Sequence, residues 1–155
     1  DNRNGNTMPI ANYTTTVPAS RSLQWILELL GNAGAKAIMQ DYESKEVCAV
    51  TFRIDRGEQQ LGFRLPCDWR KTLTVLTRAK ECPARFKTSD HAKRVAWRCV
   101  HDWLRAQLAL IEIGAAELEQ VMLPYAITHT GETLYERLKG NQFLQLRENN
   151  NESKQ

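Results

Sequence analysis

The chain has 155 residues, of which 42% are hydrophobic and 25% are charged, and its formal net charge is +3. These values are typical of one globular domain, and no apolar run approaches the roughly 20 residues of a membrane-spanning helix. The four cysteines, Cys48, Cys67, Cys82 and Cys99, are widely spaced and form no CxxC pair. This spacing favours a reduced, cytoplasmic setting over a disulfide framework.

The domain limits follow from composition. We expect residues 1–7 to be an upstream extension or a cloning remnant, residues 8–147 to form a single domain, and residues 148–155 to be a disordered polar tail. The β-branched run from Tyr13 to Val17 predicts a first strand, which Pro18 ends. A helix capped by Ser20 should follow, with Leu23, Ile26, Leu27 and Leu30 on one face and a stop at Gly31–Gly34.

Three further strands are predicted, over residues 36–42, 47–55 and 60–65, with turns at 43–46 and 56–57. Alternation in the last two strands places these side chains inward: Cys48, Val50, Phe52, Ile54, Leu61, Phe63 and Leu65. If the two strands pair as a hairpin, Arg53 and Arg64 point from the same outer face of the sheet.

The second half of the chain is predicted to be helical. A short helix over 68–78 precedes a loop, a long amphipathic helix from Ser89 to a break at Gly114, a shorter helix ended by Pro124, and a last helix over 133–139. The order β-α-β-β-β-α-α-α-α indicates an α+β fold. It comprises a small antiparallel sheet, formed as a strand, a helix and a three-strand meander, followed by a helical C-terminal half with one long helix.

One face of the long helix carries a narrow row of basic residues. Arg94, Arg98, His101 and Arg105 are spaced +4, +3 and +4, which places them within an arc of about 60° that we expect to face outward. The opposite arc predicts a core stripe of Ala92, Val95, Ala96, Cys99, Val100, Trp103, Ala106 and Leu110. Thus the helix should bury one side and present the basic row on the other.

The positive charge is concentrated in the middle of the chain. Residues 53–105 hold 13 Lys/Arg and 6 Asp/Glu, whereas the segments before and after them are mildly acidic. This distribution favours a patch that binds an acidic partner, with a solvated charged face as the alternative. The leading hypothesis is therefore electrostatic nucleic-acid binding through Arg94, Arg98, His101 and Arg105 on the helix, Arg53 and Arg64 on the sheet, and Lys87 and Lys93 nearby.

A second hypothesis is a protein–protein module, such as an inhibitor or adaptor of a host protein. One flank of the basic row is apolar and consists of Trp97, Leu104, Leu108 and Ile111. Such an apolar surface should be covered, either by a partner or by another part of the chain. The same flank could form the seam of a homodimer.

Catalytic and metal-binding motifs are not evident. Cys67, Cys82, His91 and Cys99 could be assembled into a zinc site, but their spacing is too irregular to favour one. Cys99 and His101 are neighbours on one helix and point to different faces, which disfavours a nucleophile–base pair. We therefore expect no enzyme activity, no metal and no cofactor.

Several short motifs between Val95 and Leu138 support a family resemblance. They are Ala96-Trp97, Trp103, Leu110-Ile111-Glu112, Leu123-Pro124-Tyr125 and Gly131 to Glu136. With the N-terminal YTTTVPASRS and the VTFRI…LGFRLP hairpin, this segment resembles a family of small uncharacterised proteins of bacteriophages, prophages and other mobile elements. The resemblance implies a small phage-type accessory protein and assigns no catalytic residues.

Overall fold

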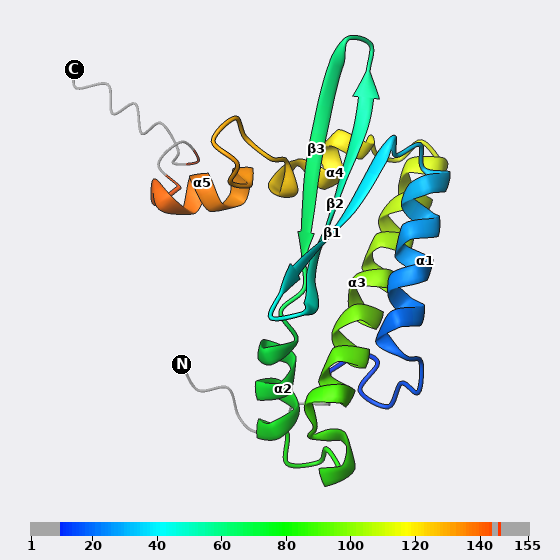
Figure 1. Ribbon diagram of the computed structural model, residues 1–155, viewed down its shortest axis with the longest axis vertical. Coiled ribbons are helices and arrows are strands. Elements are labelled where there is room, and N and C mark those ends of the chain that lie inside the picture. The colour runs from blue at the N-terminus through cyan, green and yellow to red at the C-terminus, as the bar shows by residue number, and fades with distance from the viewer. Residues whose placement is uncertain (1–9, 144–145, 147–155) are drawn as a thin grey trace, which may run out of the picture.

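A three-stranded antiparallel sheet and five helices make up the fold, in a computed structural model that describes residues 10–143 and residue 146 (Figure 1). The strands are β1 (Ala37–Glu43), β2 (Glu46–Arg56) and β3 (Gln59–Pro66), in the spatial order β1-β2-β3. The helices are α1 (Ala19–Asn32), α2 (Trp69–Arg78), α3 (Ser89–Glu112), α4 (Leu118–Met122) and α5 (Leu134–Gly140), with 3₁₀ turns η1 (Ala84–Phe86) and η2 (Leu123–Tyr125). The predicted α+β class is confirmed.

The alternating pattern of β2 and β3 produces the sheet as predicted. Val50, Phe52 and Ile54 of β2 are buried on one face, and Phe52 stacks on Phe63, its cross-strand partner in β3, with ring centroids 5.3 Å apart. The β1–β2 connection is the two residues Ser44 and Lys45, both with positive φ, the geometry of a tight hairpin turn. Hairpin geometry and burial thus fix one register for the sheet.

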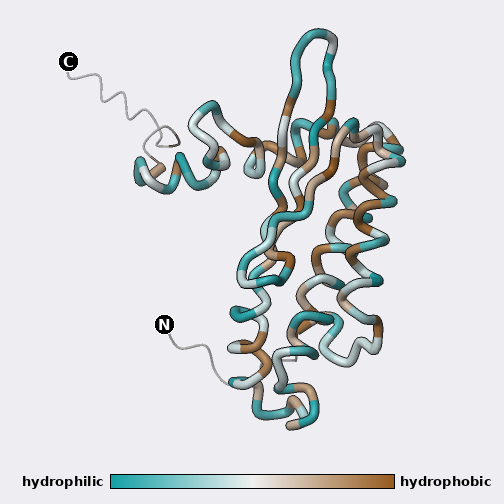
Figure 2. Tube along the Cα trace, in the orientation of Figure 1, coloured by the Kyte–Doolittle hydropathy of each residue, from teal (hydrophilic) through white to brown (hydrophobic). Residues whose placement is uncertain are grey.

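Helices α1 and α3 lie side by side in the same direction and cover one face of the sheet (Figure 1). Figure 2 shows hydrophobic stretches along both helices and hydrophilic residues at the turn between β2 and β3. The main core lies between these layers and is formed by Ile26, Leu30, Val50, Phe52, Ile54, Phe63, Leu65, Cys67, Ala96, Trp97, Leu104, Leu118 and Met122. Because α3 touches both α1 and the sheet, it is buried on more than one side.

A second, smaller core joins α2 to the start of α3. It consists of Leu76, Ala79, Cys82, Ala92 and Val95. Asp68 caps α2 by accepting a hydrogen bond from the Arg70 backbone N–H at 3.1 Å, and Thr88 caps α3 in the same way from His91 at 3.2 Å. Ser89, where the sequence predicted the start of this helix, is its first helical residue.

The predicted strand from Tyr13 to Val17 is wrong. This segment forms turns before α1, and its β-branched residues are used differently: Thr15 Oγ1 accepts a hydrogen bond from the Val17 N–H at 3.2 Å. The Tyr13 carbonyl accepts from His91 Nε2, and the Tyr13 ring meets Phe86 edge-on at 5.9 Å. Contacts to α3 and η1 therefore override the local strand preference. Helix α1 then begins directly after Pro18, without the side-chain cap expected from Ser20.

After η2 the chain leaves the two-layer core. Ala126 forms a bridge with Phe63 on the free edge of β3, and the chain then turns into α5, which lies apart from the helical layer in Figure 1. Thr133 and Glu136 cap α5 reciprocally. No helix among the described residues is long and apolar enough to cross a membrane. The predicted extension 1–7 and tail 148–155 lie outside the described residues.

Candidate nucleic-acid interface

A basic surface lies at the end of the molecule formed by α2, η1 and the first turns of α3, at the bottom of Figure 1. Residues 68–98, which form this basic end, contain nine Lys/Arg and three Asp/Glu. The second core holds α2 and the start of α3 together, so Lys71, Arg78 and Arg94 stand on packed helices, while Lys80, Arg85 and Lys87 lie in the connection between them. A rigid basic surface of this kind suits contacts with phosphates.

Most cations of the basic end lack an acidic partner. Among the described residues, none of these side chains forms an ion pair: Lys71, Arg78, Lys80, Arg85, Lys87 and Arg94. Lys87 is half-buried and the others are exposed. Lys71, Arg78, Lys80 and Arg85 were absent from the predicted site, because the sequence alone does not show that α2 and η1 pack beside the start of α3.

The predicted row on α3 does not form one outward face. Arg94 and Arg105 are exposed, but Arg98 is half-buried and His101 is buried, with 6% of its surface accessible. Helix α1 packs along this side of α3 and brings Trp25 within 5.3 Å of the His101 ring. The row is therefore split: Arg94 is exposed at the basic end, whereas Arg98, the last residue of that segment, lines the junction with α1 together with His101 and Arg105.

The two arginines of the sheet lie on the same outer face, as predicted from strand alternation. In the β2–β3 register, Thr51 pairs with Arg64 and Arg53 pairs with Gly62, which places both arginines on one side. Each is close to a carboxylate, because Arg53 Nε lies 3.3 Å from Asp55 Oδ1 and Arg64 Nε lies 3.9 Å from Asp41 Oδ2. Their charge is therefore largely compensated within the sheet.

Lys93 is also engaged within the protein. Its Nζ lies 2.5 Å from Glu46 Oε1 and 5.0 Å from the centre of the Trp69 ring. The hydrogen bond from Lys93 lowers the pKa of the Glu46 carboxyl below its ordinary value. Lys93 thus connects α3 to the start of β2, whereas Lys87 has no such partner among the described residues.

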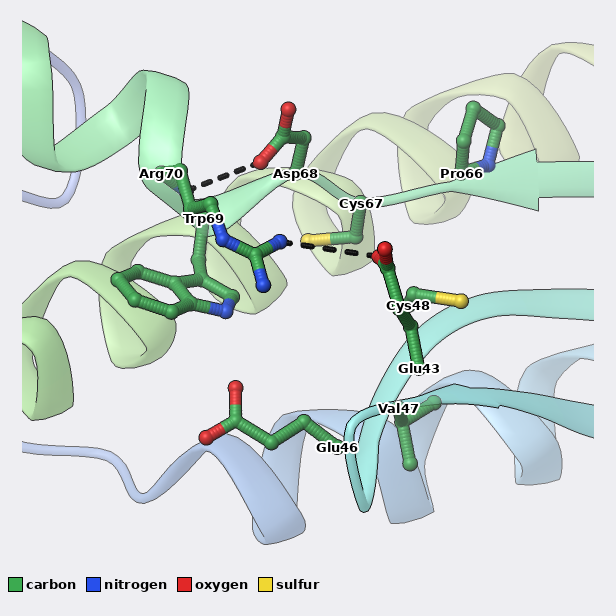
Figure 3. Close-up of a pocket in the computed structure, with 9 residues that line it drawn as sticks. All are labelled: Glu43, Glu46, Val47, Cys48, Pro66, Cys67, Asp68, Trp69 and Arg70. Carbon is green, nitrogen blue, oxygen red and sulfur yellow. Dashed lines mark hydrogen bonds and ion pairs between the residues drawn. The ribbon is translucent and has the colours of Figure 1, made fainter.

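The Lys93–Glu46 pair borders a small pocket of about 180 Å³ at the junction of the sheet and α2 (Figure 3). Its walls include Glu43, Glu46, Cys48, Cys67 and Trp69, and Arg70 reaches across it to Glu43 at 3.7 Å. Arg70 and Lys93 each pair with one carboxylate of this pocket, Glu43 and Glu46, and Asp68 is a third carboxylate in its wall. These pairs connect the basic end to the sheet and leave little net charge for a ligand.

The cysteines show no sign of activation. Burial raises the pKa of the Cys67 thiol to about 12 and also raises that of Cys99, so both remain protonated at neutral pH. Within residues 10–143 and 146, all four cysteines are free thiols, and no group of three or more His, Cys, Asp or Glu side chains could hold a metal ion.

The apolar flank proposed for partner binding is part of the core. Trp97 and Leu104 are 2% and 0% exposed, and Leu108 and Ile111 are partly buried against the same cluster. The sheet and α4 cover this flank, so Trp97 and Leu104 are not available to another molecule. Conversely, Ala106 and Leu110, which we had placed in the core stripe, are exposed.

Comparison with known proteins adds no relative: no family model, no curated protein and no solved structure matches this chain. The site must therefore be interpreted from its own residues.

Proposed function

We propose that the protein binds nucleic acid through the basic end, by contacts with phosphates that carry little sequence information. The observation that carries the proposal is the group of cations from α2 to the start of α3 that form no ion pair among the described residues. In line with the family resemblance, such a protein would serve as a cytoplasmic accessory factor of a bacteriophage or another mobile element.

Phosphate contacts fit this surface better than specific recognition of bases. Binding to phosphates depends mainly on the number of cations that can replace condensed counterions, and lysine and arginine serve equally in that role. Six unpaired cations correspond to a slope of log K against log salt of about −5 for duplex DNA, if all six contact phosphates. Affinity would then fall by about a thousandfold between 50 and 200 mM salt.

The proposal is tested with a triple variant, Lys80→Gln, Arg85→Gln and Arg94→Gln. Each substitution removes an exposed cation that has no ion pair among the described residues, so folding should be unaffected. Removing three of six contacts should reduce the salt slope by about 3 and weaken binding at low salt. Fluorescence anisotropy of labelled single- and double-stranded DNA and RNA measures both quantities.

The matched control is Lys36→Gln, Arg137→Gln and Lys139→Gln. These cations are also exposed and free of ion pairs among the described residues, but they lie before β1 and on α5, away from the basic end. The control changes the net charge equally and should leave the salt slope near the wild-type value. Equal losses in both triple variants would contradict a localised site.

The alternative function, a protein–protein module that uses the apolar flank of α3, has less support. Trp97 and Leu104, its proposed anchors, lie in the core of the single chain. A partner or a second copy that required these side chains would have to unfold the contact between α3 and the sheet.

A further inference from the structure

Strand β1 forms one edge of the sheet, and the backbone on its outer side is unpaired (Figure 1). The opposite edge is partly covered, because Ala126 bridges with Phe63 of β3 and the Ile127 N–H donates to the Gly62 carbonyl at 2.8 Å. Among the described residues, the backbone of β1 forms hydrogen bonds with β2 and with no other element. Such an open edge is a template for a further strand.

The hydrogen-bond pattern shows which residues of β1 face this free edge. The Arg53 carbonyl accepts a hydrogen bond from the Lys36 N–H at 2.8 Å, so Arg53 bonds towards β1. Its cross-strand partner Ala37 therefore bonds towards β2, and because the direction alternates along a strand, every second residue of β1 bonds outward. The irregularity between Asp41 and Tyr42 places its extra residue in β2 and leaves this alternation intact. The outward-bonding residues are Ile38, Gln40 and Tyr42.

The free edge carries little of the protection that edge strands usually have. Strand β1 is seven residues long and contains neither proline nor lysine. Its Met39 and Tyr42 side chains are large and apolar, and they are 55% and 64% exposed. Asp41 is turned onto the sheet, where its Oδ2 accepts a hydrogen bond from Thr51 Oγ1 at 2.6 Å. The edge therefore combines unpaired backbone groups with exposed apolar side chains.

We propose that β1 pairs with β1 of a second copy of this chain, antiparallel about a two-fold axis at Gln40, so that two sheets join into one. Only with the axis at Gln40 do all of the outward-bonding residues pair with one another, Gln40 with its own copy and Ile38 with Tyr42. Tyr42 is then covered by Ile38 of the second copy. On the other face of the sheet, the two Met39 side chains become diagonal neighbours, within reach of each other.

The charges of β1 suit this antiparallel arrangement. Asp41 and Glu43 both lie in the second half of the strand, so parallel pairing in register would bring each beside its own copy. With the axis at Gln40, Asp41 faces Met39 of the second copy and Glu43 faces Ala37. Lys36, which is exposed and forms no ion pair among the described residues, comes to the strand end that carries Glu43. No like charges are opposed, so a second copy is a compatible partner.

Sedimentation velocity of the unmodified protein tests self-association. Over a concentration series up to about 100 μM, we expect a species of twice the 17.8 kDa of the chain, in a proportion that rises with concentration. A monomer at every concentration would overturn the proposal.

Substitutions of Met39 test whether β1 forms the interface, and its exposure means that the monomer should stay folded. Met39→Glu places a carboxylate opposite Asp41 of the second copy, twice per dimer, and should raise the dissociation constant about tenfold or more. Met39→Lys places a cation there and should raise it clearly less. Val75→Glu, at a 44% exposed apolar residue of α2, is the matched control and should change it less than about twofold. Equal effects of Met39→Glu and Met39→Lys, or of Met39→Glu and Val75→Glu, would overturn the proposed pairing.

Engineered cysteines locate the axis. In Gln40→Cys the two thiols face each other across it, with Cα atoms about 5.5 Å apart, a separation that a disulfide spans. Oxidised glutathione should therefore cross-link this variant into a dimer on non-reducing electrophoresis. In Tyr42→Cys the two positions lie about 13 Å apart along the strands and should not cross-link. Cross-linking of Tyr42→Cys in place of Gln40→Cys, or of neither above the level of the unmodified protein, would overturn the register.

Discussion

Leu104 tests the assignment of the α3 flank to the core. Its side chain is fully buried, with 0% of its surface exposed, and it lies in the main cluster with Trp97 and Met122. Leu104→Ala removes three carbons from a site closed by α1, the sheet and α4, where little collapse is possible. Deletions of this kind cost about 3–5 kcal/mol, the sum of lost burial and the remaining cavity.

For a chain of this length, that loss lowers the melting temperature by about 6–20 °C. Leu110→Ala is the matched control, because Leu110 is on the same helix and 42% exposed. It should cost less than about 1 kcal/mol. Urea unfolding followed by circular dichroism gives both free energies of unfolding. A cost below about 1 kcal/mol for Leu104→Ala would refute the buried assignment and restore the flank as a partner surface.

Three further predictions concern single side chains. Ser22 is fully buried and its Oγ has no hydrogen-bond partner among the described residues. Ser22→Ala should therefore raise the free energy of unfolding, measured by urea titration, by about 1 kcal/mol. A clear loss of stability would show that the hydroxyl has a partner. The pKa of Asp102 in the folded protein lies below its ordinary value of 3.8. Ionised Asp102 therefore stabilises the folded state above pH 3.8, and this stabilisation is lost as the pH falls from 3.8 towards the pKa in the folded protein. Asp102→Asn should therefore lose a small part of the stability at pH 7, under about 1 kcal/mol for this partly exposed group, and less at pH 3; an equal loss at both pH values would contradict the linkage. Burial raises the pKa of the Cys67 thiol to about 12, so Cys67 should not react with iodoacetamide at pH 8 until the protein unfolds. Peptide mass spectrometry detects the label, and rapid labelling of the native protein would contradict the burial of Cys67.

Local patterns in the sequence predicted the elements with strong periodicity. The alternation of Val50, Phe52 and Ile54 identified β2, and the apolar spacing of residues 89–112 identified α3 to within a few residues of its ends. The run from Tyr13 to Val17 had the composition of a strand, but its contacts with His91 and Phe86 hold it as a set of turns.

The candidate site was harder to predict, because the exposure of a side chain depends on neighbouring elements, and a projection of one helix does not include them. The projection treated His101 as outward, but α1 covers that side of α3 with Trp25. Similarly, Arg53 and Arg64 were placed on the correct face, whereas their pairing with Asp55 and Asp41 depends on side-chain geometry across the sheet. The cations of α2 lie beside those of α3 because the second core packs α2 against α3, a contact that the sequence pattern did not predict.

The salt dependence of nucleic-acid binding by the unmodified protein tests the central proposal most directly. Anisotropy of a labelled DNA duplex would be recorded from 50 to 200 mM salt, with single-stranded DNA and RNA as parallel probes. The basic end predicts measurable binding at 50 mM and a slope of log K against log salt of up to about −5. Absence of binding at 50 mM salt, or binding that salt does not weaken, would contradict the proposed function.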